Sequence, residues 1–381
     1  MYGLTRSRAT CLIAIQCCTL KPVATIDIQE QVPLAPYTTL HIGGPARFFC
    51  EVKTESELLE AVAFARERSI PLFVLGGGSN LLVSDTGFDG LVVRAVIDHA
   101  LHIDGGYIDS RPSKKPLTYR VPAGFDWNAF VLKTVEAGIS GIECLAGIPG
   151  LVGGSPIQNI GAYGQEVAST ITQVRALDLE TLSFVDLRAE QCGFSYRRSI
   201  FNSTHRNRYI VTAVTFQFEV DATPNLTYAD LQRHFAGRGQ APKPIDIYHA
   251  VREIRHRKGM LIVEGEPDSR SAGSFFKNPI VSEPLLKEIA DTLATPLEKI
   301  PHWPSGPGQI KLAAAWLLDQ AGFHKGFVMG RAGISSRHTL ALVNRDHATF
   351  ADIAALRDTI QHEVQRRFHI QLEQEPVQLG V

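Results

Sequence analysis

The stretch GIECLAGIPGLVGGSPIQNIGAYG, residues 141–164, is rich in glycine, contains two prolines and is almost uncharged. So much glycine and proline excludes a regular helix or strand over its length. A disordered loop is disfavoured too, because the stretch carries branched apolar side chains that favour burial: Ile142, Leu145, Ile148, Val152, Ile157 and Ile160. We therefore interpret it as a hydrophobic loop whose backbone N–H groups lie against a large, flat ligand.

A second glycine cluster, LGGGSN at residues 75–80, directly follows the apolar run PLFVLG. Glycines after a strand allow backbone N–H groups to approach a pyrophosphate closely. The cluster is not a dinucleotide-binding fingerprint, because Leu81 stands where the third glycine would open a helix, and the strand-like LLVS follows. By itself it fits a simple turn and a phosphate cradle equally well.

The composition narrows the class of protein. A length of 381 residues indicates two or three domains. The formal net charge of -1 provides no field that would attract a nucleic acid. The six cysteines show no C-x-x-C pairing, which favours a reducing, cytoplasmic setting. His99 and His102 form a lone H-x-x-H pair without a nearby carboxylate, so we expect surface histidines and no metal site.

The first 26 residues contain a short apolar run after two arginines. The run is too short to span a bilayer and lacks a convincing signal-peptide cleavage site. We expect residues 1–26 to be a poorly ordered extension and the protein to have no membrane partner.

Hydrophobic patterns alternate between helix and strand along the chain. Thr54 and Glu57 form a capping box, and the strand-like runs PLFVLG and LVVRAV follow, so an α/β unit is expected first. After about residue 95 the pattern becomes strand-rich, with a helix from Trp127 capped by Asp126 and a hairpin over 175–187. Two helices are expected near the end, over 310–322 and after Thr349, before a final strand over 370–379. The fold class is therefore α+β.

Ser274 is the third residue of AGSFFKNP, residues 272–279. An isolated Gly-Ser-Phe is more often a tight turn followed by core aromatics. The functional alternative is a proton donor, because a single hydroxyl between a glycine and two phenylalanines lies where water is scarce.

Several of these segments occur in an order that resembles one flavoenzyme family. They are LGGGSNLLV (75–83), GIPGLVGGSPIQNIGAYGQE (147–166), FSYRRSIF (194–201), LTYADL (226–231), AGSFFKNP (272–279), KLAAAWLLDQAG (311–322) and EQEPVQLG (373–380). From about residue 33 onward the chain resembles UDP-N-acetylenolpyruvoylglucosamine reductases of the loop-bearing type I. Members use FAD and NADPH to reduce UDP-N-acetylglucosamine enolpyruvate to UDP-N-acetylmuramate for peptidoglycan.

The resemblance implies a domain organisation. It predicts an FAD-binding domain of the vanillyl-alcohol-oxidase (PCMH) type in two α/β subdomains, residues 27–94 and 95–258. A smaller α+β substrate-binding domain would cover residues 259–368, and residues 369–381 would return as a strand to the active site. It also implies a cytoplasmic enzyme, which we expect to be a monomer.

The resemblance assigns three catalytic residues. Ser274 would donate a proton, Arg197 would bind the substrate carboxylate and Glu375 would polarise it. The chemistry suits these residue types, because arginine offers a planar charged fork and a hydroxyl needs only correct placement beside a strongly basic carbon. Arg198 would point elsewhere on the same strand and be solvated. The protonation state of Glu375 stays open.

The resemblance also assigns binding residues. Tyr163, Tyr228, Lys258 and Asn278 are the expected substrate-binding residues, and Tyr163 could alternatively pack against the flavin. Lys258 belongs to the basic run REIRHRKGM, residues 252–260. Apart from Lys258, this run is typical of an exposed helix end. The expected FAD-binding residues are Gly76, Gly77, Gly78, Ser79, Asn80, Gly147, Ile148, Pro149, Gly153, Ser155, Asn159, Gly161, Ala162 and Gly164.

Two other functions remain open at this stage. One is a different FAD-dependent oxidoreductase of the same fold with covalently attached flavin, for which His41 is a weak attachment candidate. The other is a nucleotide-binding homologue without catalysis, which would show damage at Ser274, Arg197 or Glu375. All three residues are intact.

Overall fold

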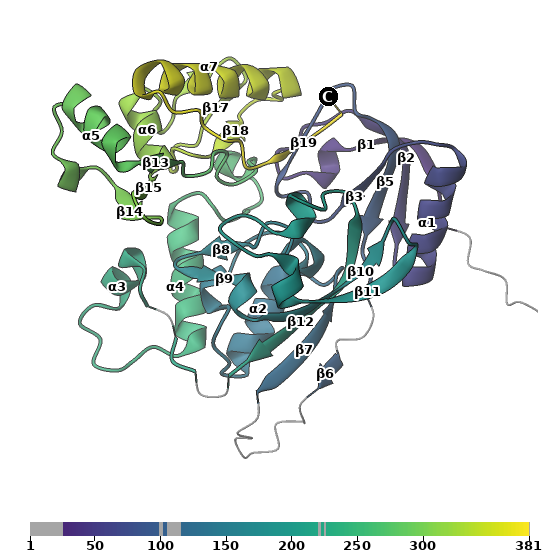
Figure 1. The fold of residues 1–381 in the computed structure, drawn as a ribbon. Helices are drawn as coiled ribbons and strands as arrows, with labels where there is room; N and C mark the ends of the chain where they lie inside the picture. Colours follow the sequence, from purple (N-terminus) through teal and green to yellow (C-terminus); the bar gives the residue numbers. More distant parts are fainter. Residues whose placement is uncertain (1–25, 99–101, 105–115, 220–221, 225, 381) are drawn as a thin grey trace, which may run out of the picture.

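A computed structural model of the chain describes residues 26–98, 102–104, 116–219, 222–224 and 226–380 (Figure 1). The expected disordered extension over residues 1–26 lies outside this range apart from Ile26. His99, half of the H-x-x-H pair, lies outside it as well.

The first unit is a four-stranded sheet with one covering helix (Figure 1). Strands β2, β5 and β3 run parallel, and β1 pairs antiparallel with β2 at the edge. Helix α1 (Glu55–Glu67) packs its buried Leu58, Ala61 and Val62 on one face of the sheet. In sheet order the strands are β1 (Gln29–Pro33), β2 (Pro45–Val52), β5 (Phe88–Ala95) and β3 (Leu72–Leu75).

The predicted capping of α1 is confirmed with one change. Thr54 Oγ1 accepts from the Glu57 N–H at 3.1 Å, as a capping box requires. The Glu57 carboxylate, however, accepts from the N–H of Lys53, one residue before the cap. The helix start is still fixed from both sides of Thr54.

The second unit is a five-stranded antiparallel sheet. Helices α2 (Trp127–Glu136) and α4 (Pro244–Arg257) share its hydrophobic core. Asp126 caps α2 by accepting from the Ala129 N–H at 2.7 Å, as predicted. The hairpin predicted over 175–187 is the β10–β11 pair. In sheet order the strands are β11 (Ser183–Arg188), β10 (Ile171–Asp178), β12 (Tyr209–Phe218), β7 (Leu117–Pro122) and β6 (His102–Asp104).

The glycine-rich segment 141–164 contains no long helix or strand, as its sequence predicts. It folds into 3₁₀ turns over Glu143–Leu145 and Val152–Gly154, and ends in the two-residue strand β8 (Gly161–Ala162), which pairs with β9 (Gln165–Glu166). Ile142, Leu145 and Val152 are fully buried. The segment is therefore an ordered part of the core.

The C-terminal part is built from two small antiparallel sheets and three helices. Helix α7 (Phe350–Phe368) lies at the top of Figure 1 and buries the predicted stripe of Ile353, Leu356, Ile360, Val364 and Phe368. The other elements are the sheet of β13 (Ile280–Ser282), β15 (Gln309–Leu312) and β14 (His302–Pro304), the sheet of β16 (Val328–Met329), β17 (Ala332–Ile334) and β18 (Leu342–Asn344), and helices α5 (Glu283–Thr292) and α6 (Ala314–Gln320).

The helix predicted over 310–322 was placed too early. Residues up to Leu312 form β15 and pair with both β13 and β14, so the helix begins only at Ala314. The apolar spacing of Leu312 with Trp316 and Leu317 imitates a helical stripe, although Leu312 is buried from the strand side. Pairing with two neighbouring strands decided the conformation here.

The C-terminal part is joined to the first unit through packing and hydrogen bonds. Its core includes Leu40, Ile42 and Leu82 from the first unit. The last strand, β19 (Val377–Leu379), pairs in parallel with β4 (Leu81–Val83). The final strand is therefore shorter than the predicted 370–379.

Asn344 links the two parts through its buried side chain, which is 3% exposed. Its amide donates to the Leu40 carbonyl at 3.0 Å and accepts from the Ala348 N–H at 2.8 Å. We expect Asn344→Ala to lower the free energy of unfolding by about 1–3 kcal/mol, because it leaves buried polar groups without partners. Urea unfolding would measure this. Gln217→Ala, at an exposed position of β12, is the control, and an equal loss in both variants would contradict the prediction.

Candidate active site

The two glycine clusters meet in space with their backbones almost in contact. A Cβ on Gly77 would lie 2.5 Å from the Gly150 Cα, and a Cβ on Gly78, whose φ is +62°, would lie 1.8 Å from the Tyr37 carbonyl oxygen. Ser79 Oγ also donates to the Pro149 carbonyl at 2.9 Å. Only glycine permits this approach, so the clusters together form one loop surface.

This loop surface has an open side that fits a large polar ligand. At Gly76 and Gly154 no heavy atom lies within 4 Å of where a Cβ would stand, whereas at Gly153 a Cβ would meet Ala123 at 2.6 Å. Ser155 Oγ is buried and has no hydrogen-bond partner among the described residues. Open glycines beside an unpartnered hydroxyl suit the phosphates and ring of FAD.

Some predicted FAD-binding side chains are used inside the protein instead. The Asn159 amide donates to the Glu166 carboxylate at 2.8 Å and to the Ser195 carbonyl at 3.1 Å, and it accepts from the Ala168 N–H. The Asn80 amide donates to Gln158 Oε1 at 2.8 Å. These side chains therefore shape the loop, and what they can offer a cofactor is chiefly backbone.

Glu143, which the sequence analysis did not single out, holds the start of the segment 141–164 through buried hydrogen bonds. Its carboxylate is fully buried and accepts from the Gly141 N–H at 2.5 Å and from the Gln165 amide at 2.9 Å. The sequence offers a weak signal, since Glu143 is the single charged residue of the segment 141–164.

The other predicted FAD-binding residues of the segment 141–164 make contacts of different kinds. Gly147, at φ +70°, packs against Arg255, where a Cβ would come within 3.3 Å of the guanidinium Nε. Ile148 lies against the core of the second unit. Pro149 receives the bond from Ser79, whereas Gly161, Ala162 and Gly164 belong to the β8–β9 turn or its tip.

Arg197 and Glu375 form a close, largely buried ion pair. Arg197 Nε lies 3.0 Å from Glu375 Oε1, and the side chains are 20% and 11% exposed. The Nε–H does not point at the carboxylate, so the contact is an ion pair without hydrogen-bond geometry. Arg197 Nη2 instead donates to the Gly161 carbonyl at 2.8 Å. The guanidinium is thereby fixed between Glu375 and the glycine-rich loop.

The local structure around Arg197 differs from the predicted strand. Ser195 and Arg198 pair with each other across a tight turn, and Arg197 occupies its tip with a φ of 53°. A left-handed conformation is unfavourable for arginine, and such strain is concentrated at functional sites. Arg198 is exposed, as predicted.

Ser274 lies on the segment that contacts Glu375. The Glu375 N–H donates to the Phe275 carbonyl at 2.9 Å, so Ser274 precedes the residue bonded to Glu375. The rings of Phe275 and Phe276 are buried in the C-terminal core, while Ser274 is half-buried. Its hydroxyl has no hydrogen bond to any residue that the structure describes, which leaves it available to a ligand.

The surroundings of Glu375 shift the pKa of its carboxyl group upward. Burial raises the pKa of Glu375 above the ordinary glutamate range, and the nearby cations Arg197 and Lys277 oppose the shift without cancelling it. A raised pKa increases the fraction that can donate a hydrogen bond.

Three of the predicted substrate-binding residues, Lys258, Tyr163 and Tyr228, lie together and form a second cluster, apart from Arg197 and Glu375. The ammonium of Lys258 lies 5.7 Å from the ring centre of Tyr163 and 5.9 Å from that of Tyr228, and the rings meet edge to face at 5.2 Å. Lys258 Nζ also lies 2.5 Å from the carboxylate of Asp230 on α3 (Ala229–Phe235). Burial raises the pKa of Tyr163 to about 12, so this phenol stays neutral. Asn278, by contrast, accepts from the Ala314 N–H at 2.9 Å and helps to fix the start of α6.

The basic run 252–260 is less exposed than the sequence suggested. Arg255 is only 7% exposed, because it shares the inner face of α4 with Val251 and Ile254, and it donates to the Met260 carbonyl at 2.7 Å. Its Nε is buried without a hydrogen-bond partner among the described residues. The helical spacing from Val251 was the signal that could have shown this.

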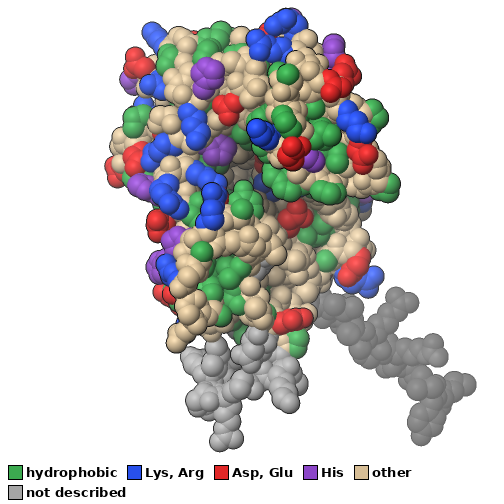
Figure 2. Space-filling view, turned by 90° about the vertical axis from the view of Figure 1, so that its left-hand side faces the viewer, with side chains coloured by type: hydrophobic (Ala, Val, Ile, Leu, Met, Phe, Trp, Pro, Cys, Tyr) green, Lys and Arg blue, Asp and Glu red, His purple; other side chains and the backbone are tan. Residues whose placement is uncertain are grey.

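Figure 2 shows the face of the molecule that carries α3, α4 and the C-terminal elements. Charged side chains gather over its upper part, and the lower part is mainly uncharged. A cavity of about 470 Å³ beside the second cluster is lined by Asp230, Arg233, His234, Ile254, Arg257 and Lys258.

Among the described residues, no helix has the length and apolar character needed to cross a membrane, and no group of three His, Cys, Asp or Glu side chains could hold a metal.

Two family models and several known proteins are similar to this chain. Residues 46–181 match the family model of an FAD binding domain, and residues 266–379 match that of the UDP-N-acetylenolpyruvoylglucosamine reductase C-terminal domain. The solved structure of UDP-N-acetylenolpyruvylglucosamine reductase from Thermus caldophilus is similar with a TM-score of 0.61 and 28% identity, covering 93% of this chain and 100% of that one.

Relatives with curated names are closer in sequence. UDP-N-acetylenolpyruvoylglucosamine reductase from Thermobifida fusca is 42% identical over 94% of this chain and 99% of its own length. The enzymes of that name from Streptomyces coelicolor and Cupriavidus pinatubonensis are each 40% identical, over 95% and 93% of this chain and 92% and 99% of their own lengths. Because such similarity extends over nearly the whole length, the chain belongs to the UDP-N-acetylenolpyruvoylglucosamine reductase family.

Proposed function

We propose that the protein reduces UDP-N-acetylglucosamine enolpyruvate to UDP-N-acetylmuramate, a precursor of peptidoglycan, with FAD as its cofactor and NADPH as the source of hydride. One observation carries the proposal: the Arg197–Glu375 ion pair lies between the glycine-rich loop surface and the segment of Ser274. The family membership of the chain supports the same reaction.

The loop surface would hold FAD. Gly76 and Gly154 offer open backbone, and Ser155 offers a buried hydroxyl. When bound, FAD supplies hydride to the terminal carbon of the enolpyruvyl group. The protein side chains around it would bind the substrate carboxylate and donate the proton.

Arg197 and Glu375 would act on the substrate carboxylate. Addition of hydride to the terminal carbon leaves a pair of electrons on the carbon next to the carboxylate, and they delocalise onto its oxygens. The guanidinium would bind these oxygens, and a protonated Glu375 would donate a hydrogen bond to the growing negative charge. The raised pKa of Glu375 supports this second role.

Ser274 would complete the reaction by giving its hydroxyl proton to the carbon next to the carboxylate. The proton replaces the electron pair with a C–H bond, and solvent restores the proton to the serine. A hydroxyl is a weak acid, so its contribution depends on placement beside a strongly basic carbon. The half-buried position and the unpartnered hydroxyl suit that role.

The second cluster would bind the nucleotide part of the substrate. Lys258 offers a cation for the diphosphate, and Tyr163 and Tyr228 present rings around it. Tyr228 is 40% exposed, as expected for a residue that closes over a ligand. Asn278 would contribute its amide N–H groups, because its carbonyl is already bonded to Ala314.

We also propose that the enzyme works as a monomer in the cytoplasm. The three cysteines that the structure describes, Cys50, Cys144 and Cys192, are free and buried, which suits a reducing compartment.

Purified protein tests the function directly. We expect a yellow preparation that releases FAD on denaturation and oxidises NADPH rapidly only when UDP-N-acetylglucosamine enolpyruvate is present. A colourless protein that cannot take up FAD, or oxidation of NADPH that ignores the enolpyruvyl substrate, would refute the proposal.

Ser274→Ala separates proton donation from flavin reduction. We expect NADPH to bleach the flavin at the normal rate, while turnover of the enolpyruvyl substrate falls by roughly 10²–10⁴, as for a lost general acid. Stopped-flow absorbance follows both half-reactions. Normal reoxidation of the reduced flavin by substrate in the variant would exclude Ser274 as the donor.

Arg197→Lys tests whether the planar guanidinium of Arg197 binds both oxygens of the substrate carboxylate. One ammonium cannot bind two carboxylate oxygens in parallel, so we expect kcat to fall by about 10²-fold or more although the charge is kept. Steady-state kinetics measure the change, with Arg198→Lys as the exposed neighbouring control. Similar kinetics in the two variants would contradict the role of Arg197.

Glu375→Gln tests whether the protonated carboxyl group is the active form. The raised pKa of Glu375 means that turnover should decline as pH rises through it, above the ordinary glutamate range. Glutamine keeps a donor and cannot ionise, so this decline should disappear while part of the activity remains. Glu375→Ala should lose more activity than Glu375→Gln, and a pH profile unchanged in the glutamine variant would rule out the assignment.

A further inference from the structure

Helix α4 ends at Arg257, and Lys258 is its C-cap in a complete Schellman motif. Gly259 takes a φ of +64°, its N–H donates to the His256 carbonyl at 3.0 Å, and the Met260 N–H donates to the Arg255 carbonyl at 2.8 Å. The backbone of Lys258 is therefore fixed by the way this helix ends.

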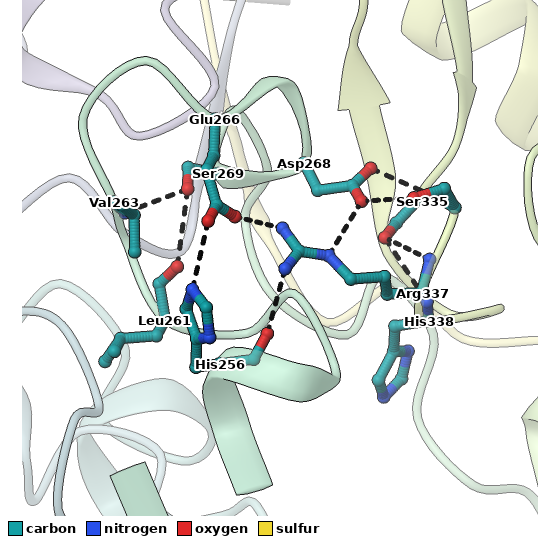
Figure 3. Close-up of polar contacts among 10 residues, drawn as sticks. His256, Leu261, Val263, Glu266, Asp268, Ser269, Ser335, Arg337 and His338 are labelled. Atoms are coloured by element: carbon teal, nitrogen blue, oxygen red, sulfur yellow. Dashed lines mark hydrogen bonds and ion pairs between the residues drawn. The ribbon is translucent and has the colours of Figure 1, made fainter. Parts of the chain in front are cut away.

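Arg337, from the turn between β17 and β18, reaches the same helix end (Figure 3). Its Nη1 donates to the His256 carbonyl at 3.0 Å. A Cβ on Gly259 would lie 3.1 Å from Arg337 Nε, so the guanidinium rests directly against the motif. A cation at this position also interacts favourably with the negative end of the helix dipole.

Two carboxylates fix the other side of the guanidinium (Figure 3). Arg337 Nη2 pairs with Glu266, whose other oxygen lies 3.0 Å from His256 Nε2. Arg337 Nε donates to Asp268 at 3.1 Å, and Asp268 also accepts from the N–H and the hydroxyl of Ser336. The side chain of Arg337 is 28% exposed and that of Asp268 10% exposed, so the contacts are partly shielded from bulk water.

The charges in this group reinforce one another. The hydrogen bond with Glu266 raises the pKa of Arg337, and the bonds from Arg337 and His256 lower the pKa of Glu266. Burial alone would raise the pKa of Asp268, but the bonds from Ser336 and Arg337 lower it overall. All three groups are therefore ionised near neutral pH.

The segment that carries Arg337 also holds the segment of Ser274. The Leu340 carbonyl, three residues after Arg337, accepts from the Phe275 N–H at 2.8 Å. His338 Nδ1 accepts from the Leu340 N–H at 3.0 Å and stiffens the connection. Residues 337–340 thus contact the helix end at Lys258 and the backbone next to Ser274.

We propose that Arg337 is a positioning residue that sets the place of Lys258 relative to Ser274, and so the fit between the diphosphate and the reacting carbon of the substrate. The inference rests on the proposed function for the identity of the substrate. Arg337 itself touches neither of the two side chains and acts through the end of α4 and the 337–340 segment.

Arg337→Gln removes the charge and the fork while keeping a polar side chain. We expect the KM for UDP-N-acetylglucosamine enolpyruvate to rise about tenfold with kcat changed by less than about threefold, because a small displacement of Lys258 weakens binding more than chemistry. In a Lys258→Met background the same substitution should change KM by less than about twofold, since the group through which it acts is gone.

Arg208→Gln is the matched control. Arg208 is 27% exposed and also pairs with two carboxylates, Asp178 and Glu180, on the second sheet unit. It should lose comparable thermal stability without the rise in KM. If Arg337→Gln folds poorly, Arg337→Lys keeps the charge and should show a smaller increase in KM.

Hydrogen exchange gives a second measurement that needs no activity. The amides of Gly259 and Met260 should exchange faster in Arg337→Gln than in the wild type and in Arg208→Gln. An unchanged KM, an equal rise in KM in the Lys258→Met background, or unchanged exchange at these amides would each overturn the inference. A wild-type protein inactive toward the enolpyruvyl substrate would refute the proposed function, and the exchange experiment would still test Arg337.

Discussion

The close approach of two glycine loops is the constraint on which the site depends. Gly77 and Gly150 leave no space for a side chain between them, and Gly78 is pressed against the carbonyl of Tyr37. This contact aligns the loop after β3 with the loop before β8, although the two are far apart in sequence. The open side of the loop surface, the anchor for Arg197 at Gly161 and the bond between Ser79 and Pro149 all follow from that alignment.

The charged groups are organised differently around Arg197 and around Arg337. Next to the glycine-rich loop, Arg197 and Glu375 are close but imperfectly aligned, and the Nε–H of Arg197 lacks a hydrogen-bond acceptor among the described residues. Around Arg337, by contrast, the guanidinium bonds with two carboxylates and a helix carbonyl. A pair that is not fully satisfied can turn toward a ligand, whereas a satisfied group resists movement. This difference fits a reactive pair at Arg197 and a rigid support at Arg337.

The sequence predicted the fold well where a local signal agreed with the tertiary structure. The caps at Thr54 and Asp126, the apolar stripe of α7 and the irregular, buried segment 141–164 are all found in the structure. The prediction was wrong at Leu312, where pairing with two strands overrides an apparent helical stripe. It was also wrong for the strand expected at Arg197, because a turn held by Ser195 and Arg198 gives no distinctive composition.

The candidate site also has features that the sequence predicted and features that it did not. Motif order indicated Ser274, Arg197, Glu375 and Lys258. In the structure Glu375 contacts Arg197 and the residue after Ser274, and Lys258 lies beside Tyr163 and Tyr228. Side-chain partners could not be predicted, because they join residues distant in sequence: Asn159 bonds to Ser195, and Glu143 to Gln165. The burial of Arg255 was readable from helical spacing, yet its chemical type suggested exposure.

The pairing of β19 with β4 has a consequence for synthesis on the ribosome. Strand β4 is made about 300 residues before its partner, so its edge stays unpaired in the growing chain until β19 has emerged. Glu375 lies just before β19, so its ion pair with Arg197 also joins segments that are made far apart in time. Filling of the β4 edge and formation of the Arg197–Glu375 ion pair therefore both depend on the same late segment of the chain.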